Sequence, residues 1–303
     1  MAGEGRAVSF IASSRIGDRT VGIALVAGSA VLWSTAGLFV RMARLDPWTV
    51  LGWRSLSSAL FLGAFFILRN GRRGRAVMSR MGWPDIFLIV SSCIATIAYV
   101  FALELTTVAN VMTVYATLPF VAAGIAFVWI GERAGPRLLV ASAIALAGVA
   151  AMAGAATSAR DIAGNLAAFA MTVGFGLQLV HVKRHPGADM PLIMAVAAGL
   201  CAALSWPFMA VAVPSLWQIA ILAAFGIVTT GLGYIMALDG GRRIGSGEAG
   251  IVSMLDVVLG PLWVWLAFAE VPGRPVLVGG ALVLAAVLWY LWHDLRRPEI
   301  KVC

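Results

Sequence analysis

Residues 107–130 read TVANVMTVYATLPFVAAGIAFVWI and contain no charged side chain. This stretch is longer than the roughly 20 residues that an α-helix needs to cross the hydrocarbon core of a bilayer. A backbone in lipid must satisfy its own hydrogen bonds, which a single helix does and an open strand does not. The stretch therefore predicts a transmembrane helix, and the rest of the chain repeats its pattern.

Ten segments share this length and apolar character. They cover residues 20–40, 47–68, 84–103, 107–130, 136–155, 161–181, 190–211, 216–238, 247–269 and 275–293. Hydrophobic residues make up 61% of the chain and charged residues 12%, whereas a soluble domain has roughly 45–50% apolar residues. The mean hydropathy of +0.94 agrees. We expect an all-α membrane protein with ten transmembrane helices, and the composition excludes a soluble α/β fold.

The basic residues predict the orientation in the membrane. Of the 22 Lys and Arg, 17 lie in segments on the side of the N-terminus, four lie on the opposite side, and Arg54 lies within a predicted helix. Because cytoplasmic loops are enriched in Lys and Arg, we expect both termini in the cytoplasm. The basic residues form no stripe along a polar helix, so nucleic acid is not an expected partner despite the net charge of +8.

Cysteine usage predicts neither a disulfide framework nor a metal site. Cys93 and Cys201 lie within predicted helices, and Cys303 is the last residue. No CxxC pair is present, and no predicted helix carries two His at ligand spacing. We therefore expect no cofactor and no metal.

Matched positions predict an internal repeat. The sequence YVFAL at 99–103 corresponds to YIMAL at 234–238, and Trp33 corresponds to Phe175. We expect one repeat in residues 1–156 and a second in residues 157–303. Five helices in each repeat is an odd number, so the second copy enters the membrane from the opposite side. Such inverted repeats are typical of transporters that expose a site to each side in turn.

A shared motif ends the fourth and ninth predicted helices. LPFV at 118–121 leads to Gly131-Glu132, and LDVVLGPLW at 255–263 leads to Ala269-Glu270. On these motifs the chain resembles the EamA repeat of the drug/metabolite transporter superfamily, over nearly all of residues 18–293. The resemblance implies a carrier of a bacterial inner membrane, with a central cavity that the fifth and tenth helices do not line. Among its members the chain is most similar to exporters of aromatic amino acids.

Two prolines predict breaks in the spanning helices. Pro119 and Pro261 each remove a backbone donor and free the carbonyl four residues earlier. In the second copy Val257 stands where the first has Pro119, so we expect that bend at Pro261 instead. Free carbonyls at this depth need protein or a wet cavity around them, which favours a substrate site between the two breaks. A structural kink without a ligand is the alternative.

Deep aromatic and polar residues are the candidates for lining this cavity. They are Trp33, Ser34, Arg54, Tyr99, Asn110, Tyr115, Phe175, Gln178, Tyr234, Ser253, Asp256 and Trp263. Aromatic walls suit a solute with an aromatic or aliphatic side chain, although each ring is equally suited to ordinary helix packing. The neutral polar groups favour a zwitterionic or uncharged solute over a phosphate ester, which requires several Arg or Lys.

Two charges lie within the predicted helices and are costly in hydrocarbon. Arg54 suits a substrate carboxylate, or it pairs with Asp256. Asp256 is a candidate for proton coupling, and a carboxylate hydrogen-bonded to nearby backbone is the alternative. The sequence leaves open whether protons drive transport or the solute moves down its own gradient.

These features predict a secondary transporter that exports small metabolites, amino acids including aromatic ones, by alternating access. Efflux of other neutral or cationic compounds, or transport of nucleoside- or sugar-type solutes, remains open, and a channel is the non-carrier alternative. An enzyme is not expected, because HExxH is absent and residues 244–247 lack the first Gly of a GxSG motif. Alanines 143, 147, 151 and 155 predict close helix packing, a homodimer face or a lipid-facing row, so the chain is expected to be a monomer or a homodimer.

Overall fold

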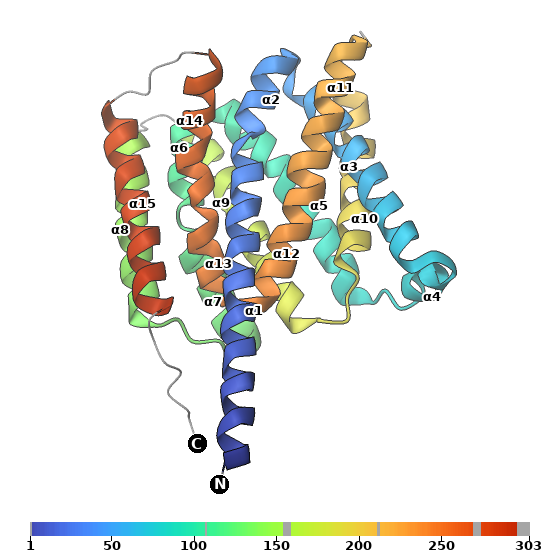
Figure 1. The fold of residues 1–303 in the computed structure, drawn as a ribbon. Coiled ribbons are helices and arrows are strands. Elements are labelled where there is room, and N and C mark those ends of the chain that lie inside the picture. Colours follow the sequence, from blue (N-terminus) through green and yellow to red (C-terminus); the bar gives the residue numbers. More distant parts are fainter. Residues whose placement is uncertain (1, 107, 154–158, 211–212, 269–273, 296–303) are drawn as a thin grey trace.

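The computed structural model describes residues 2–106, 108–153, 159–210, 213–268 and 274–295, and in these ranges the regular elements are helices (Figure 1). In chain order they are α1 (Ala2–Ser34), α2 (Ala36–Ala43), α3 (Pro47–Asn70), η1 (Gly71–Arg73), α4 (Gly74–Met78), α5 (Trp83–Leu105), α6 (Val108–Tyr115), α7 (Leu118–Ile130), α8 (Pro136–Ala153), α9 (Ala159–Arg184), α10 (Met190–Ser205), η2 (Trp206–Phe208), α11 (Leu216–Phe225), η3 (Gly226–Gly233), α12 (Tyr234–Arg243), α13 (Ser246–Ser253), α14 (Leu255–Phe268) and α15 (Arg274–Leu295). The all-helical fold confirms the class that the apolar pattern predicts.

Seven helical stretches in the described ranges are long and apolar enough to cross a membrane. They are Gly17–Ala43, Pro47–Met78, Trp83–Ala102, Ile162–Arg184, Met190–Phe208, Leu216–Arg243 and Ser246–Phe268. Three shorter apolar helices, Leu118–Ile130, Pro136–Ala150 and Leu277–His293, lie within the remaining predicted spans. Large apolar side chains such as Leu68 and Val128 are each 85% exposed. Surfaces of this kind are stable against hydrocarbon rather than water, so the chain is a multi-pass membrane protein.

Two helices begin at matched Asp and Pro residues. Pro47 lies in the first turn of α3 and Pro191 in the first turn of α10, where the missing N–H costs nothing. Asp46 and Asp189 precede these turns, and each carboxylate accepts a backbone N–H three residues later, at 2.9 and 3.1 Å. These local signals determine where both helices start.

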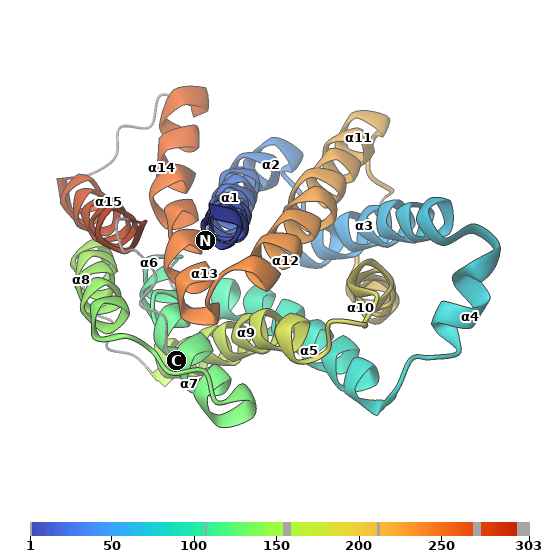
Figure 2. The ribbon, with the colours of Figure 1, turned by 60° about the horizontal axis from the view of Figure 1, so that its bottom comes forward.

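Seen along the bundle, the helices form two rows (Figure 2). One row runs α15, α14, α1, α12 and α3, where α3 contacts η3, the segment that continues into α12. The other row runs α8, α7, α9, α5 and α10, with neighbours in contact. The rows join where α8 packs on α15 and α3 on α10, and again where α7 meets α13 and α9 meets α12. Each row therefore mixes helices from both halves of the sequence. Helix α1 begins and α15 ends at the same end of the bundle (Figure 1).

The contact between α8 and α15 uses small residues, but not all of those expected. Gly148 approaches so closely that an added Cβ would lie 2.8 Å from the carbonyl oxygen of Gly279. Ala141 and Ala145 are buried on the same face, whereas Ala143 and Ala147 are exposed. Ala143 and Ala147 therefore lie on the exposed face of α8, as in a lipid-facing row or a homodimer face, and the side chains of Ala151 and Ala155 lie outside the described part of the structure.

Candidate functional site

Four aromatic rings meet between the two rows. They are Trp33 near the end of α1, Tyr115 at the end of α6, Phe175 in α9 and Tyr234 at the start of α12. The Phe175 centroid lies 6.3 Å from Trp33, 6.0 Å from Tyr115 and 6.4 Å from Tyr234. Trp33 and Tyr234 are 5.5 Å apart in an edge-to-face arrangement. These separations fall within the roughly 4.5–7 Å at which rings attract each other, so the four form one aromatic cluster.

The aromatic cluster forms the walls of a small cavity. Its lining residues are Trp33, Tyr115, Leu118, Phe175, Gln178, Leu179, Tyr234, Ala237, Leu238 and Ser253. The space open to the centres of water molecules is about 10 Å³, which is room for about one water. In this conformation the side chains fill the site, and a larger solute requires them to separate. The cavity brings together six of the residues predicted to line it.

The helices around the cavity are interrupted. Helix α1 gives way to α2 at Thr35, α6 to α7 at Ala116 and Thr117, and α13 to α14 at Met254. At these breaks a hydroxyl donates to a carbonyl three or four residues earlier: Ser34 to Val31 at 2.6 Å, Thr117 to Val114 at 2.7 Å, and Ser253 to Ala249 at 2.8 Å. Such back-bonding satisfies carbonyls that a broken helix leaves free, and it also bends helices.

The two predicted proline breaks differ in outcome. Pro119 lies in the first turn of α7, directly after the break that follows Tyr115. Pro261 lies inside helix α14, which runs from Leu255 to Phe268 without interruption, so a bend at that residue stays a prediction. The second half of the chain is interrupted at Met254, where the Ser253 hydroxyl bonds back to the Ala249 carbonyl and no proline is needed.

A π-helix lies beside the aromatic cluster. In η3 the wider i→i+5 turn changes which carbonyls are paired, and π-turns are frequent at functional sites. The Trp33 indole Nε1–H donates to the Thr229 carbonyl of η3 at 3.0 Å. At Gly233 a Cβ would lie 2.7 Å from Nε1, so glycine is required for this approach. Sequence patterns did not indicate either the π-helix or this bond.

Ser34 and Trp263 also lie together, away from the cavity lining. The Trp263 Nε1–H donates to the Ser34 hydroxyl at 2.7 Å, which joins α14 to the end of α1. Gln178 is buried and donates through Nε2 to the Ser92 hydroxyl at 3.2 Å, which joins α9 to α5. The predicted site residues Asn110 and Pro261 have side chains outside the described part of the structure.

Arg54 of α3 and Asp256 of α14 are not among the residues that line the cavity. The Arg54 guanidinium is 5.1 Å from the centre of the Phe225 ring, a cation–π contact. Asp256 lies in the first turn of α14, and its Oδ1 is buried without a hydrogen-bond partner. Tyr99 of α5 packs against the buried apolar core that includes Tyr115. Among the ion pairs of the described residues, none joins Arg54 to Asp256.

Two buried cysteines meet between α5 and α10. The sulfurs of Cys93 and Cys201 are 3.4 Å apart, and both thiols are free. The sequence places them in separate halves with no spacing motif, so their proximity was not predictable from it. They join a helix of the first half to a helix of the second.

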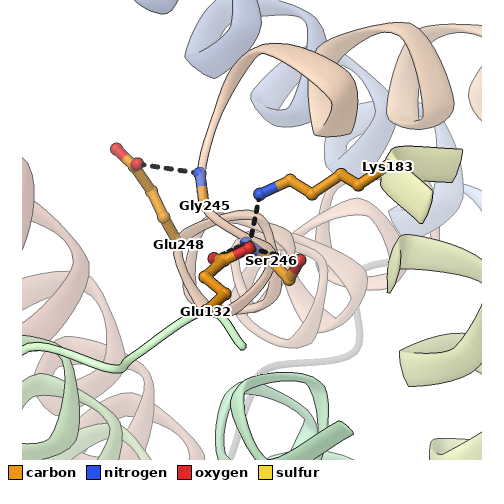
Figure 3. Close-up of polar contacts among 5 residues, drawn as sticks. All are labelled: Glu132, Lys183, Gly245, Ser246 and Glu248. Carbon is orange, nitrogen blue, oxygen red and sulfur yellow. Dashed lines mark hydrogen bonds and ion pairs between the residues drawn. The ribbon is translucent and has the colours of Figure 1, made fainter. Parts of the chain in front are cut away.

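Polar contacts gather where α7 and α9 end and α13 begins (Figure 3). This is the end of the bundle at which α1 begins (Figure 1). Glu132 follows α7 and accepts hydrogen bonds from Lys183 of α9 and from Ser246 of α13. Glu248 accepts from Arg19 of α1 at 2.6 Å and from the backbone of Gly245 at 3.4 Å. We call this region the Glu132 end of the bundle. The ion pair of Glu132 with Lys183, at 2.9 Å, therefore joins the end of α7 to the end of α9.

Comparison with known protein families indicates the class of protein that has this geometry. Residues 20–154 match the profile of the EamA-like transporter family. The match covers the first expected repeat and supports the EamA family that the LPFV motif predicts. It thereby supports a membrane transporter.

Comparison with solved structures gives the fold. One structure, described as "Crystal structure of protein", superposes with a TM-score of 0.79 and covers 92% of this chain and 100% of its own. The two sequences are 21% identical, so the likeness shows a shared fold. No curated protein matches the sequence.

Proposed function

We propose that this chain is a secondary transporter that exports small metabolites across a bacterial inner membrane, with amino acids, including aromatic ones, as substrates. The observation that carries the proposal is the aromatic cluster around the closed cavity. Rings with a few polar neighbours suit a solute that has an apolar side chain and a polar or zwitterionic end. The lining comes from α1, α6 and α7 of the first half and from α9, α12 and α13 of the second.

The arrangement of helices supports alternating access. If the second half repeats the first, α1 corresponds to α9, α3 to α10, α5 to α12, and α8 to α15. The main packing contacts agree with this correspondence. Helix α3 packs on its counterpart α10, and α8 packs on its counterpart α15. The contact of α5 with α9 has a counterpart in the contact of α12 with α1. The breaks at Ala116 and Met254 also correspond. Two inverted five-helix repeats of this kind expose a central site to each side by rocking against each other.

The charged groups support a substrate with an ionic end. Arg54 offers a guanidinium to a carboxylate, and the unpartnered Oδ1 of Asp256 offers an acceptor to an ammonium group. Because a buried carboxylate also attracts a cation, export of cationic compounds is the second candidate. The positive-inside distribution of Lys and Arg supports a cytoplasmic location for the Glu132 end.

Competition in proteoliposomes tests the proposal. Purified protein is reconstituted, loaded with labelled Phe, and assayed for saturable counterflow against Phe, Trp, Thr, Met, Lys and Glu. We expect Phe and Trp to compete best, and a Trp33→Ala variant to lose most of the activity. Trp265→Ala is the matched control, because that indole is exposed on α14. Inhibition by phosphorylated sugars alone would overturn the substrate class, and unitary conductance would indicate a channel.

A further inference from the structure

The carboxylate of Glu132 is held by three donors from two other elements. Its Oε1 accepts the backbone N–H of Ser246 at 2.8 Å. Its Oε2 accepts from the Lys183 ammonium at 2.9 Å and from the Ser246 hydroxyl at 3.3 Å. Hydrogen bonds that involve an ionised group are stronger than neutral ones, and the N-terminus of α13 adds a favourable dipole. Figure 3 shows these groups converging on one side chain.

Backbone geometry places Glu132 for this role. Gly131 ends α7 with a φ of +72°, a left-handed conformation that glycine adopts without strain. The turn lets the Glu132 N–H bond back to the carbonyl of Ala126 at 3.2 Å, which fixes the first residue after the helix. The side chain thus leaves the end of α7 in a defined direction, toward α13 and α9.

The elements that Glu132 joins are the ones that surround the cavity. Helix α9 carries Phe175 about 12 Å from Lys183, and α13 carries Ser253 about 10 Å from Ser246, at 1.5 Å per residue. Helix α7 begins with Leu118, which also lines the cavity. One path from the cavity to the Glu132 end runs between α7 and its neighbours α13 and α9, and opening it separates α7 from α13 or α9. Such a separation breaks the contacts of Glu132.

We propose that Glu132, with Lys183 and Ser246, is the latch that closes the Glu132 end of the cavity during transport. The proposal rests on the proposed transport function and adds a residue that controls one of its two gates. Glu132 is half-buried, with its side chain 30% exposed, and that of Lys183 is 17% exposed. Solvent screening therefore weakens the ion pair enough for it to open and close repeatedly. The latch biases a two-state equilibrium without contacting the substrate.

Thiol accessibility tests the latch without any substrate. In a variant with Cys93, Cys201 and Cys303 replaced, Ala237→Cys places one thiol in the cavity lining. Vesicles with the Glu132 end outward are treated with a membrane-impermeant thiol reagent. We expect Glu132→Gln to raise the labelling rate about threefold to tenfold. Asp239→Asn is the control, since it breaks an ion pair with Arg243 at the same end but within α12.

A double-mutant cycle separates a latch from general loosening. If Glu132 and Lys183 act as one unit, Glu132→Gln with Lys183→Met changes labelling no more than either single variant. Unchanged labelling in Glu132→Gln, or fully additive effects, would overturn the proposal. The unfolding temperature in detergent is measured for each variant, and faster labelling that merely tracks a lower unfolding temperature also counts against the latch. Absence of counterflow in every variant, with labelling still controlled by Glu132, would instead refute the transport function.

Discussion

Trp33 shows how one side chain connects the cavity to the backbone around it. Its ring faces Phe175 and Tyr234, while its Nε1–H bonds to the Thr229 carbonyl in the π-helix. The indole therefore lines the cavity and also joins α1 to η3 through its hydrogen bond.

Replacing Trp33 with Phe keeps a ring but leaves the Thr229 carbonyl without its donor. The lost hydrogen bond is worth about 0.5–1.5 kcal/mol, so we expect a lower unfolding temperature in detergent and weaker binding of the counterflow substrate. Trp263→Phe is the matched variant, because Ser34 still donates to the Val31 carbonyl after the indole is lost. Equal destabilisation by the two substitutions would argue against a special role for the hydrogen bond between Trp33 and Thr229.

Asp256→Asn tests whether the buried carboxylate takes part in coupling. If Asp256 carries the coupling proton, its amide replacement makes counterflow vary less than about twofold across a pH series in which the native rate changes. Asp239→Asn, at the exposed end of α12, keeps the native profile. A native pH profile in Asp256→Asn would exclude coupling at this residue and leave it as a group that binds the solute or the backbone.

At the level of elements, the spanning helices were predictable and their interruptions only in part. Apolar stretches without charge define the helices, and Pro47 and Pro191 begin two of them. We expected prolines to mark the breaks. The break at Met254 is instead accompanied by the Ser253 hydroxyl, which donates to the Ala249 carbonyl. Ser and Thr occur throughout spanning helices without bending them, so a sequence pattern does not reveal which ones do. The π-helix has no sequence signature at all.

The π-helix depends on glycines that let other helices approach. At Gly226 a Cβ would lie 2.2 Å from the backbone oxygen of Arg54, so Gly226→Ala forces α3 and η3 apart. Overpacking of this kind costs about 1–3 kcal/mol, and we expect a lower unfolding temperature and reduced counterflow. Gly63→Ala is the control, because nothing lies within 4 Å of the added Cβ and alanine favours the helix by about 1 kcal/mol. Equal stability of the two variants would contradict the close approach.

At the scale of the whole molecule, the two halves of the sequence are interleaved rather than side by side. Each row of helices contains members of both halves, and the contacts between α3 and α10 and between α8 and α15 join them at the edges (Figure 2). Matched motifs such as YVFAL and YIMAL predict that a repeat exists, but not which helices touch. The pairing of helices depends on the shapes of their surfaces and on small residues such as Gly148. A single sequence does not show which of its many small residues form the contacts.

Oxidative cross-linking tests the interleaving directly. The thiols of Cys93 in α5 and Cys201 in α10 are 3.4 Å apart, close enough for a small shift to reach the roughly 2.05 Å of a disulfide. A protease site inserted between residues 156 and 157, in a Cys303→Ser background, allows the halves to be cut apart. Copper phenanthroline with dissolved oxygen removes two electrons and two protons from the thiols. We expect the cut halves to migrate together until reductant is added, whereas a further Cys201→Ser variant gives two fragments throughout. Separate fragments in the oxidised Cys93–Cys201 protein would show that α5 and α10 are not neighbours in the membrane, and the proposed rocking of two interleaved repeats would fail with that contact.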